Sequence, residues 1–385
     1  MFGRLQENVI SEADLDGLVD FIRHTKRFTQ FDKVKEFEAA FSRWQGCRYS
    51  VFVNSGSSAN LVLVSALKER RGWRDGDEIL VPAVTWPTTV TPVIQCGLTP
   101  VFVDANLTDL GLDCDEVQRK ITPRTRGIFV AHLLGFPSDM RRLTGIVGGR
   151  DIAIMEDACE SQGATIDGVK VGNLSSGGTF SFYWGHHMTS VEGGMLCTND
   201  EELYTLCVLK RSHGLARELP PEYHAGLKAR YPDIDFSFLF LTDGLNVRNT
   251  EFGAVLGLRQ LDRLDEYIRI RNANYARFAD MCDRYPDDLI VLRAPGVSSF
   301  VLPFLFRRAD RKLAFQAAIR EAGIESRPLI SGNLLRQPFL RQYYDPADFT
   351  NADFLHANAF YIGNNQFVDA ARLTILEDLM ARCLL

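Results

Sequence analysis

Residues 152–160 have the sequence IAIMEDACE, an apolar run that ends in a group of carboxylates. The first four residues are all apolar, as is typical of a strand buried on both faces of a sheet. Asp157 and Glu160 follow where that strand should end. A buried carboxylate is costly unless a cation or metal meets it, whereas at a helix start the helix dipole favours it. The stretch therefore indicates either a cation-binding strand end or an ordinary helix start.

Similar strands precede this stretch and alternate with segments of helical periodicity. We expect strands at 50–53, 78–82, 99–104, 127–132 and 152–156, with helices at 59–70, 87–96 and 115–120. This alternation predicts an α/β fold with a mostly parallel sheet covered by helices on both faces. Ligands of such sheets bind outside the carboxyl ends of the strands.

The pattern changes after residue 177. We expect strands at 179–183 and 194–197, a polar loop at 217–235 and a long charged helix at 250–271. A second unit should contain a strand at 301–306 and helices at 311–322 and 367–384. The sequence thus predicts a large domain at 1–275, including an N-terminal segment, and a smaller C-terminal α/β domain at 276–385.

The composition excludes several classes of protein. The chain has 385 residues, of which 46% are hydrophobic, enough for a large core without disulfide or metal staples. Its net charge of −6, with no basic block, argues against nucleic-acid binding. The eight cysteines are isolated, so we expect no metal or iron–sulfur site. Without a signal peptide or an apolar run of about 20 residues, a cytoplasmic protein with no membrane contact is expected.

Three further motifs point to a ligand site. Residues 54–60, NSGSSAN, follow a predicted strand and open a helix, where small residues let amides and hydroxyls surround an anion. An ordinary capped helix explains this motif equally well. Trp86 follows another strand end and is suited to cover a flat ligand, although a tryptophan in the core is the more common case.

The third motif, residues 179–194, reads TFSFYWGHHMTSVEGG and contains two adjacent histidines. An imidazole beside a ligand can act as both acid and base near neutral pH. The pair lacks the spacing of helical metal ligands, and on a strand or turn His186 and His187 should point apart. A histidine pair with a purely structural role remains the alternative.

In this order and spacing, the motifs resemble the DegT/StrS aminotransferase–dehydratase family of fold-type-I pyridoxal-phosphate enzymes, which modify nucleotide sugars. The resemblance runs through most of the chain and covers residues 52–60, 80–89, 100–104, 155–160, 180–194, 246–261 and 362–363. It implies an aspartate-aminotransferase-like fold with pyridoxal 5′-phosphate or pyridoxamine 5′-phosphate as cofactor.

The resemblance also implies roles for individual residues. Gly56, Ser57 and Ser181 match ligands of the cofactor phosphate, and Trp86 matches the residue stacked on the pyridine ring. Asp157 matches the carboxylate that pairs with the ring nitrogen, and Glu160 the position near the ring hydroxyl. Asn246 matches a residue that the family donates to the partner subunit's site, which implies a homodimer with shared active sites. Substrate contacts are expected from Arg248, Arg327 and Asn333.

One position departs from most of the family. Most members carry a lysine, which forms a Schiff base with the cofactor, six residues before the glutamate of EGG; here that position is His186. No lysine lies between Lys170 and Lys210, so no neighbour replaces it. A histidine here is similar to the sugar-nucleotide 3-dehydratases of the family, notably those acting on GDP-4-keto-6-deoxymannose.

The resemblance therefore implies a 3-dehydratase that removes the 3-hydroxyl of a 4-keto-6-deoxy hexose nucleotide, with His186 as acid and base. Pyridoxamine phosphate held without a covalent bond would supply the amine, and glutamate is the expected amine donor. Two alternatives remain. One is a sugar-nucleotide aminotransferase lacking the Schiff-base lysine; the other is a non-catalytic regulator that binds the cofactor or a nucleotide sugar.

Overall fold

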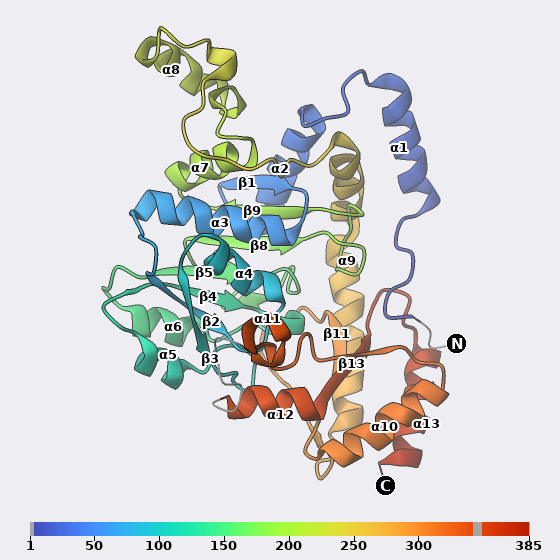
Figure 1. Cartoon of the computed structure of the whole chain (residues 1–385). Coiled ribbons are helices and arrows are strands. Elements are labelled where there is room, and N and C mark those ends of the chain that lie inside the picture. The colour runs from blue at the N-terminus through green and yellow to red at the C-terminus, as the bar shows by residue number, and fades with distance from the viewer. Residues whose placement is uncertain (1–3, 342–348, 385) are drawn as a thin grey trace.

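The computed structural model describes residues 4–341 and 349–384 as two units, each built around a sheet (Figure 1). The larger sheet has seven strands in the order β1-β9-β8-β5-β4-β2-β3. Its strands are β1 (Tyr49–Val53), β2 (Glu78–Pro82), β3 (Thr99–Val103), β4 (Thr125–Ala131), β5 (Ala153–Asp157), β8 (Gly177–Ser181) and β9 (Gly194–Thr198). A separate two-stranded sheet pairs β6 (Thr165–Ile166) with β7 (Val169–Lys170).

Within the described ranges, the larger unit also contains nine α-helices, most of which pack on its sheet or connect its strands. These helices are α1 (Glu12–His24), α2 (Asp32–Gln45), α3 (Gly56–Arg71), α4 (Pro87–Gln95), α5 (Cys114–Lys120), α6 (Met140–Val147), α7 (Glu201–Arg211), α8 (His224–Arg230) and α9 (Glu251–Cys282). The smaller unit has a sheet in the order β10-β11-β13-β12. Its elements are β10 (Leu289–Ile290), β11 (Val301–Phe306), α10 (Ala309–Glu321), β12 (Ser326–Pro328), α11 (Pro338–Arg341), α12 (Thr350–Asn358), β13 (Ala359–Gly363) and α13 (Ala370–Cys383).

The large sheet is mostly parallel. Strands β3, β2, β4, β5 and β8 pair in parallel, and β9 runs antiparallel to both β8 and β1. All five residues of β5 are buried, because helices lie on both faces of the sheet. The expected α/β fold, with a mostly parallel central sheet and a smaller C-terminal α/β unit, is confirmed.

Two hydrophobic layers hold the helices against the sheet. On one face, α3 and α4 contribute apolar side chains to the main core, including Val62, Leu63 and Val90. On the other face, Phe37 and Phe41 of α2 pack against Phe52 and Phe180 of the sheet. These ring pairs are 5.0 and 5.3 Å apart in edge-to-face geometry, a favoured arrangement for buried aromatic rings.

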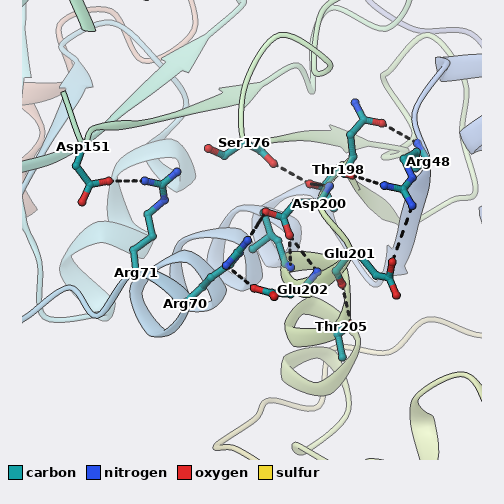
Figure 2. A network of polar contacts seen from close by, with 12 residues as sticks. Arg48, Arg70, Arg71, Asp151, Ser176, Thr198, Asp200, Glu201, Glu202 and Thr205 are labelled. Atoms are coloured by element: carbon teal, nitrogen blue, oxygen red, sulfur yellow. Dashed lines mark hydrogen bonds and ion pairs between the residues drawn. The ribbon is translucent and has the colours of Figure 1, made fainter. Parts of the chain in front are cut away.

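Salt bridges fix the far end of α3 (Figure 2). Arg70, in its last turn, binds Asp200 at 2.6 Å and Glu202 at 2.7 Å, and Arg71 binds Asp151 at 2.7 Å. Asp200 also caps α7, so one carboxylate links the end of α3 to the start of α7. Basic residues in a last turn complement the helix dipole. With its C-terminal end held in this way, α3 directs its N-terminus toward the carboxyl ends of the strands.

Several elements differ from the sequence expectations, among them β8, α8 and α9. Strand β8 begins at Gly177 and ends at Ser181, two residues earlier than expected, and the expected loop at 217–235 contains the short helix α8. Helix α9 continues to Cys282 because Tyr275, Phe278 and Cys282 extend its buried face onto the smaller unit. The expected domain boundary at 275/276 falls inside α9.

The segment around α8 projects beyond the end of the large sheet (Figure 1). It carries exposed aromatic side chains, with Phe238 66% and Phe240 55% accessible. Both rings are therefore largely open to solvent in this chain.

Candidate active site

A cavity of about 840 Å³ lies at the carboxyl ends of β5 and β8. Asp157 and Ser181, the last residues of these strands, line it from the larger unit. Arg327 of β12 and Tyr361 of β13 line it from the smaller unit. Parallel sheets typically bind their ligands at this edge.

The first wall of the cavity is the N-terminus of α3. Gly56 and Ser57 open this helix, Ser55 caps it by accepting from Ser58 N, and Ser181 lies opposite. A Cβ atom on residue 56 would lie 2.7 Å from Ser181 Cβ and 2.8 Å from Cys159 Sγ, so only glycine fits without displacing them. The positive end of a 16-residue helix and two serine hydroxyls together suit an anion such as a phosphate.

Asp157 provides a fixed carboxylate at the base of the cavity and is 7% exposed. Its Oδ2 atom accepts hydrogen bonds of 2.8 Å from Asn60 Nδ2 and from Thr89 Oγ1. Its Oδ1 atom accepts from the Cys159 amide at 3.1 Å. These three donors hold the carboxylate in one orientation, so Asp157 can meet a cationic ligand group in a water-poor place.

Trp86 and Glu160 complete the part of the cavity around Asp157. Trp86 precedes α4, lines the cavity and remains 58% exposed, so its indole is available to a flat ligand and is not a core residue. Burial, reinforced by the Asp157 charge, raises the pKa of Glu160 to about 7, although the Leu134 amide donates to Glu160 Oε2 at 3.0 Å. Glu160 is therefore partly protonated at neutral pH and can donate a hydrogen bond.

His186 also lines the cavity. Its Nδ1 atom lies 2.7 Å from the carbonyl oxygen of Cys159. Because a carbonyl only accepts, Nδ1 carries the proton and the Nε2 lone pair of the neutral ring is left free. Burial lowers the pKa of His186 to about 4, against the raising effects of the Cys159 carbonyl and of Asp157. The imidazole is therefore neutral at pH 7 and able to accept a proton.

His187 lies outside the cavity lining, although its ring packs against the same Phe300 ring as His186. It is fully buried, and its Nε2 atom lies 3.2 Å from the Ser298 carbonyl oxygen, so the ring contacts the smaller unit. Burial lowers its pKa well below the usual value. No lysine is among the described residues that line the cavity, so the structure offers no amine in place of His186.

The other sequence-predicted residues lie in different places. Arg327 lines the cavity and binds Glu325 at 2.8 Å. Asn246 is exposed and accepts from Arg248 Nε at 3.1 Å, and neither residue lines the cavity of its own chain. Asn333 is fully buried outside the cavity lining, and its Nδ2 atom donates to Asp353 at 2.7 Å.

Sequence reasoning missed several residues of the site. Asn60 and Thr89 hold Asp157, and both are polar side chains on helix faces that point inward. Both residues follow a predicted strand end by several positions, and a polar residue at such a place in the sequence indicates a possible site residue. The N-terminal segment also reaches the cavity, where the Leu5 amide donates to Glu325 Oε2 at 3.1 Å. No local pattern reveals that long-range contact.

Comparison with known proteins places this architecture in one family. The model of the DegT/DnrJ/EryC1/StrS aminotransferase family matches residues 10–371. The chain belongs to this family. It is 36% identical over 357 residues to GDP-4-keto-6-deoxy-D-mannose 3-dehydratase of Escherichia coli O55:H7 (strain CB9615 / EPEC), covering 90% of this chain and 92% of the relative.

Two solved structures of family members are close to this fold. A mutant of GDP-4-keto-6-deoxymannose-3-dehydratase (ColD) with bound GDP-perosamine has a TM-score of 0.91 and 33% identity, covering 98% of this chain and all of that one. The same kind of enzyme with a trapped PLP-glutamate geminal diamine has a TM-score of 0.90 and 31% identity, covering 98% and 99%. The expected family, fold type and class of pyridoxal-phosphate-dependent enzyme are confirmed.

The residues of this chain fit the family's cofactor. Gly56 leaves room that a side chain would fill, the start of α3 and two serines suit a phosphate, and Asp157 suits a ring nitrogen that carries a proton. In residues 4–341 and 349–384, no group of three or more His, Cys, Asp or Glu side chains could hold a metal ion. None of the helices in these ranges combines the length and the apolar character that a membrane span requires.

Proposed function

We propose that this chain is a cytoplasmic, pyridoxamine-phosphate-dependent sugar-nucleotide 3-dehydratase. Its substrate is a GDP-linked 4-keto-6-deoxy hexose, and it removes the 3-hydroxyl. The observation that carries this proposal is the oriented, neutral His186 in a cavity wall where no described residue is a lysine. The full-length similarity to GDP-4-keto-6-deoxy-D-mannose 3-dehydratase supports the choice of substrate.

The chain's own residues define where the cofactor would be held. Gly56, Ser57 and Ser181 would bind its phosphate, Trp86 would cover its ring, and Asp157 would keep its ring nitrogen protonated. When bound, pyridoxamine phosphate supplies the amine that joins the 4-keto carbon and a ring that takes up electrons. Glu160, with its raised pKa, would donate to the ring hydroxyl.

His186 moves the proton in this proposal. Its Nε2 atom is the basic atom of the ring and accepts a proton in the cavity. The protonated imidazole then gives that proton to the departing 3-hydroxyl of the sugar. The Cys159 carbonyl stabilises the ring throughout, because Nδ1 donates to it in both the neutral and the cationic form. A lysine here would bind the cofactor covalently and favour transfer of the amine.

The substrate contacts and the amine donor are proposed as follows. Arg327, which lines the cavity, is proposed to contact the anionic substrate. Arg248 lies beside Asn246 outside this cavity and is proposed to contact the substrate of the partner subunit, and the buried Asn333 is proposed to support the site. Glutamate is proposed as the amine donor. Support comes from the related dehydratase structure that contains a PLP-glutamate geminal diamine.

We also propose a homodimer with shared active sites. Asn246 is exposed and does not line its own cavity, as expected of a residue that serves the partner subunit. Exposed Phe238 and Phe240 on the projecting α8 segment offer apolar surface for such a contact.

One experiment tests the proposed reaction. Purified protein is incubated with pyridoxamine phosphate, glutamate and 4-keto-6-deoxy hexoses carrying GDP, CDP or dTDP, and the products are identified by mass spectrometry. We expect a 3-deoxy sugar and ammonia, with the GDP substrate preferred. An amino sugar would show the enzyme to be an aminotransferase, and cofactor binding without turnover would favour a regulator.

A further inference from the structure

Arg271 of α9 carries a buried charge that the proposed reaction does not use. It is 1% exposed, and no carboxylate within the described ranges forms an ion pair with it. Burial lowers its pKa to about 9, which leaves the guanidinium cationic at neutral pH. An unpaired buried cation is costly, so the hydrogen bonds that it makes are informative.

The guanidinium joins backbone carbonyls from three separate segments. Nη1 donates to the Phe300 carbonyl at 2.9 Å and to the Asn364 carbonyl. Nη2 lies 3.4 Å from the carbonyl oxygen of His186. Asn364 returns a bond of 2.9 Å from its Nδ2 atom to the Arg271 carbonyl. One side chain thus ties the His186 turn to two segments of the smaller unit.

The contact with Phe300 gives Arg271 a second route to His186. The Phe300 ring stacks on the His186 ring, with centroids 5.2 Å apart and an interplanar angle of 29°. The same ring lies 5.6 Å from His187 at 30°. By holding the Phe300 backbone, Arg271 also fixes the surface against which both imidazoles rest.

The charge of Arg271 acts on His186 as well. Burial is the main cause of the lowered His186 pKa, and the Arg271 cation lowers it further. The Cys159 carbonyl and the Asp157 carboxylate act in the opposite direction. The guanidinium therefore helps to keep the imidazole neutral, the form needed in a base.

We propose that Arg271 is a positioning residue for His186: by joining the His186 carbonyl to those of Phe300 and Asn364, it fixes the imidazole in the cavity wall. This inference rests on the proposed function, in which His186 moves the proton. It adds a residue that touches neither the cavity nor a ligand and that couples the smaller unit to the base.

Two substitutions distinguish the hydrogen bonds of Arg271 from its positive charge. Arg271→Lys keeps a cation but cannot join three carbonyls, and Arg271→Met removes the charge while keeping an extended side chain. We expect both to lower kcat by roughly 10²-fold, a loss typical of a misplaced reacting group, with KM and cofactor affinity unchanged. In ¹⁵N-histidine spectra of the cofactor-loaded enzyme, we expect Arg271→Met, but not Arg271→Lys, to raise the pH at which His186 titrates.

A second arginine on α9 provides the matched control. Arg277→Met, on the same helix, removes an arginine that pairs with Glu377 at the surface, and it should leave kcat and the His186 signal unchanged. Wild-type kcat in a folded Arg271 variant, or an unchanged His186 titration in a folded Arg271→Met variant, overturns the proposal. If neither Arg271 variant folds, Phe300→Leu should reproduce the kcat loss, and full activity in it refutes the idea. The titration requires no turnover, so it tests Arg271 even where the substrate assignment fails.

Discussion

The side-chain nitrogen of Asn60 lies 2.8 Å from the Oδ2 atom of Asp157. This bond joins the second turn of α3 to the last residue of β5, and Thr89 of α4 donates to the same oxygen at 2.8 Å. The helix that presents the proposed phosphate site is thereby tied to the carboxylate proposed to meet the ring nitrogen. The distance between the two ends of the cofactor site is set by these bonds.

Thr89→Val should weaken cofactor binding. Valine keeps the shape of threonine but removes a hydrogen bond to a carboxylate, which typically contributes about 1.5–3 kcal/mol. We expect the dissociation constant for pyridoxal phosphate, measured by absorbance titration, to rise by roughly tenfold or more. Thr91→Val, on the same helix, is the control and should bind normally. Equal affinities in the two variants would contradict the role assigned to Thr89.

His186→Asn should retain pyridoxamine phosphate and lose turnover. The proposed ring and phosphate contacts come from other residues, whereas the acid–base group is gone. We expect kcat to fall by roughly 10²–10⁴-fold, the usual contribution of a positioned proton-transfer group. If His186 only packs against its neighbours, the asparagine variant should lose little activity.

His186→Lys should create a covalent link to pyridoxal phosphate and shift the products from deoxy sugar toward amino sugar. Borohydride reduction followed by peptide mass spectrometry should find cofactor on residue 186 in this variant and on no residue of the wild type. Cofactor trapped on a wild-type lysine would show that the catalytic position has been misassigned.

Two inactive subunits should complement each other if the active sites are shared. His186→Asn and Asn246→Ala affect opposite contributors to one site, so a mixed dimer would contain one intact site. After unfolding and refolding together, random pairing should restore about a quarter of wild-type activity. Separately refolded samples are the control. No recovery, or a fully active monomer in ultracentrifugation, would exclude shared sites.

Glu160 should make stability depend on pH. Its pKa is raised to about 7 in the fold from an ordinary value of 4.5, so the folded protein holds this proton more tightly than the unfolded chain. The stability that protonated Glu160 contributes to the folded state is fully present below pH 4.5 and is lost as the pH rises through 7. Glutamine has no ionisable proton, so Glu160→Gln should avoid this loss. In denaturant titrations of the cofactor-free protein, we expect its free energy of unfolding to exceed that of the wild type by on the order of 1–3 kcal/mol between pH 5 and 8. A constant difference across this range would contradict the raised pKa.

The smaller unit shows why the sequence alone predicts only part of the site. Strand β11 is correctly expected at 301–306, since six buried apolar residues in a row are a local signal. Arg327 and Asn333 are expected near the substrate by resemblance, yet only Arg327 lines the cavity. Neighbouring residues set the path of a strand, whereas the turn after β12 depends on what packs against it from distant parts of the chain.

The sequence by itself determined the strand–helix alternation, the order of the motifs and the presence of histidine where most of the family has lysine. These features depend on residues close together in the chain, whose spacing fixes periodicity and motif. Only the tertiary structure decided that His186 faces the cavity with Nδ1 on Cys159, and that His187 faces Ser298. It alone brought Arg271 to His186, 85 positions apart in the chain. Such contacts form only when the whole core packs, because burial, and not local sequence, selects their partners.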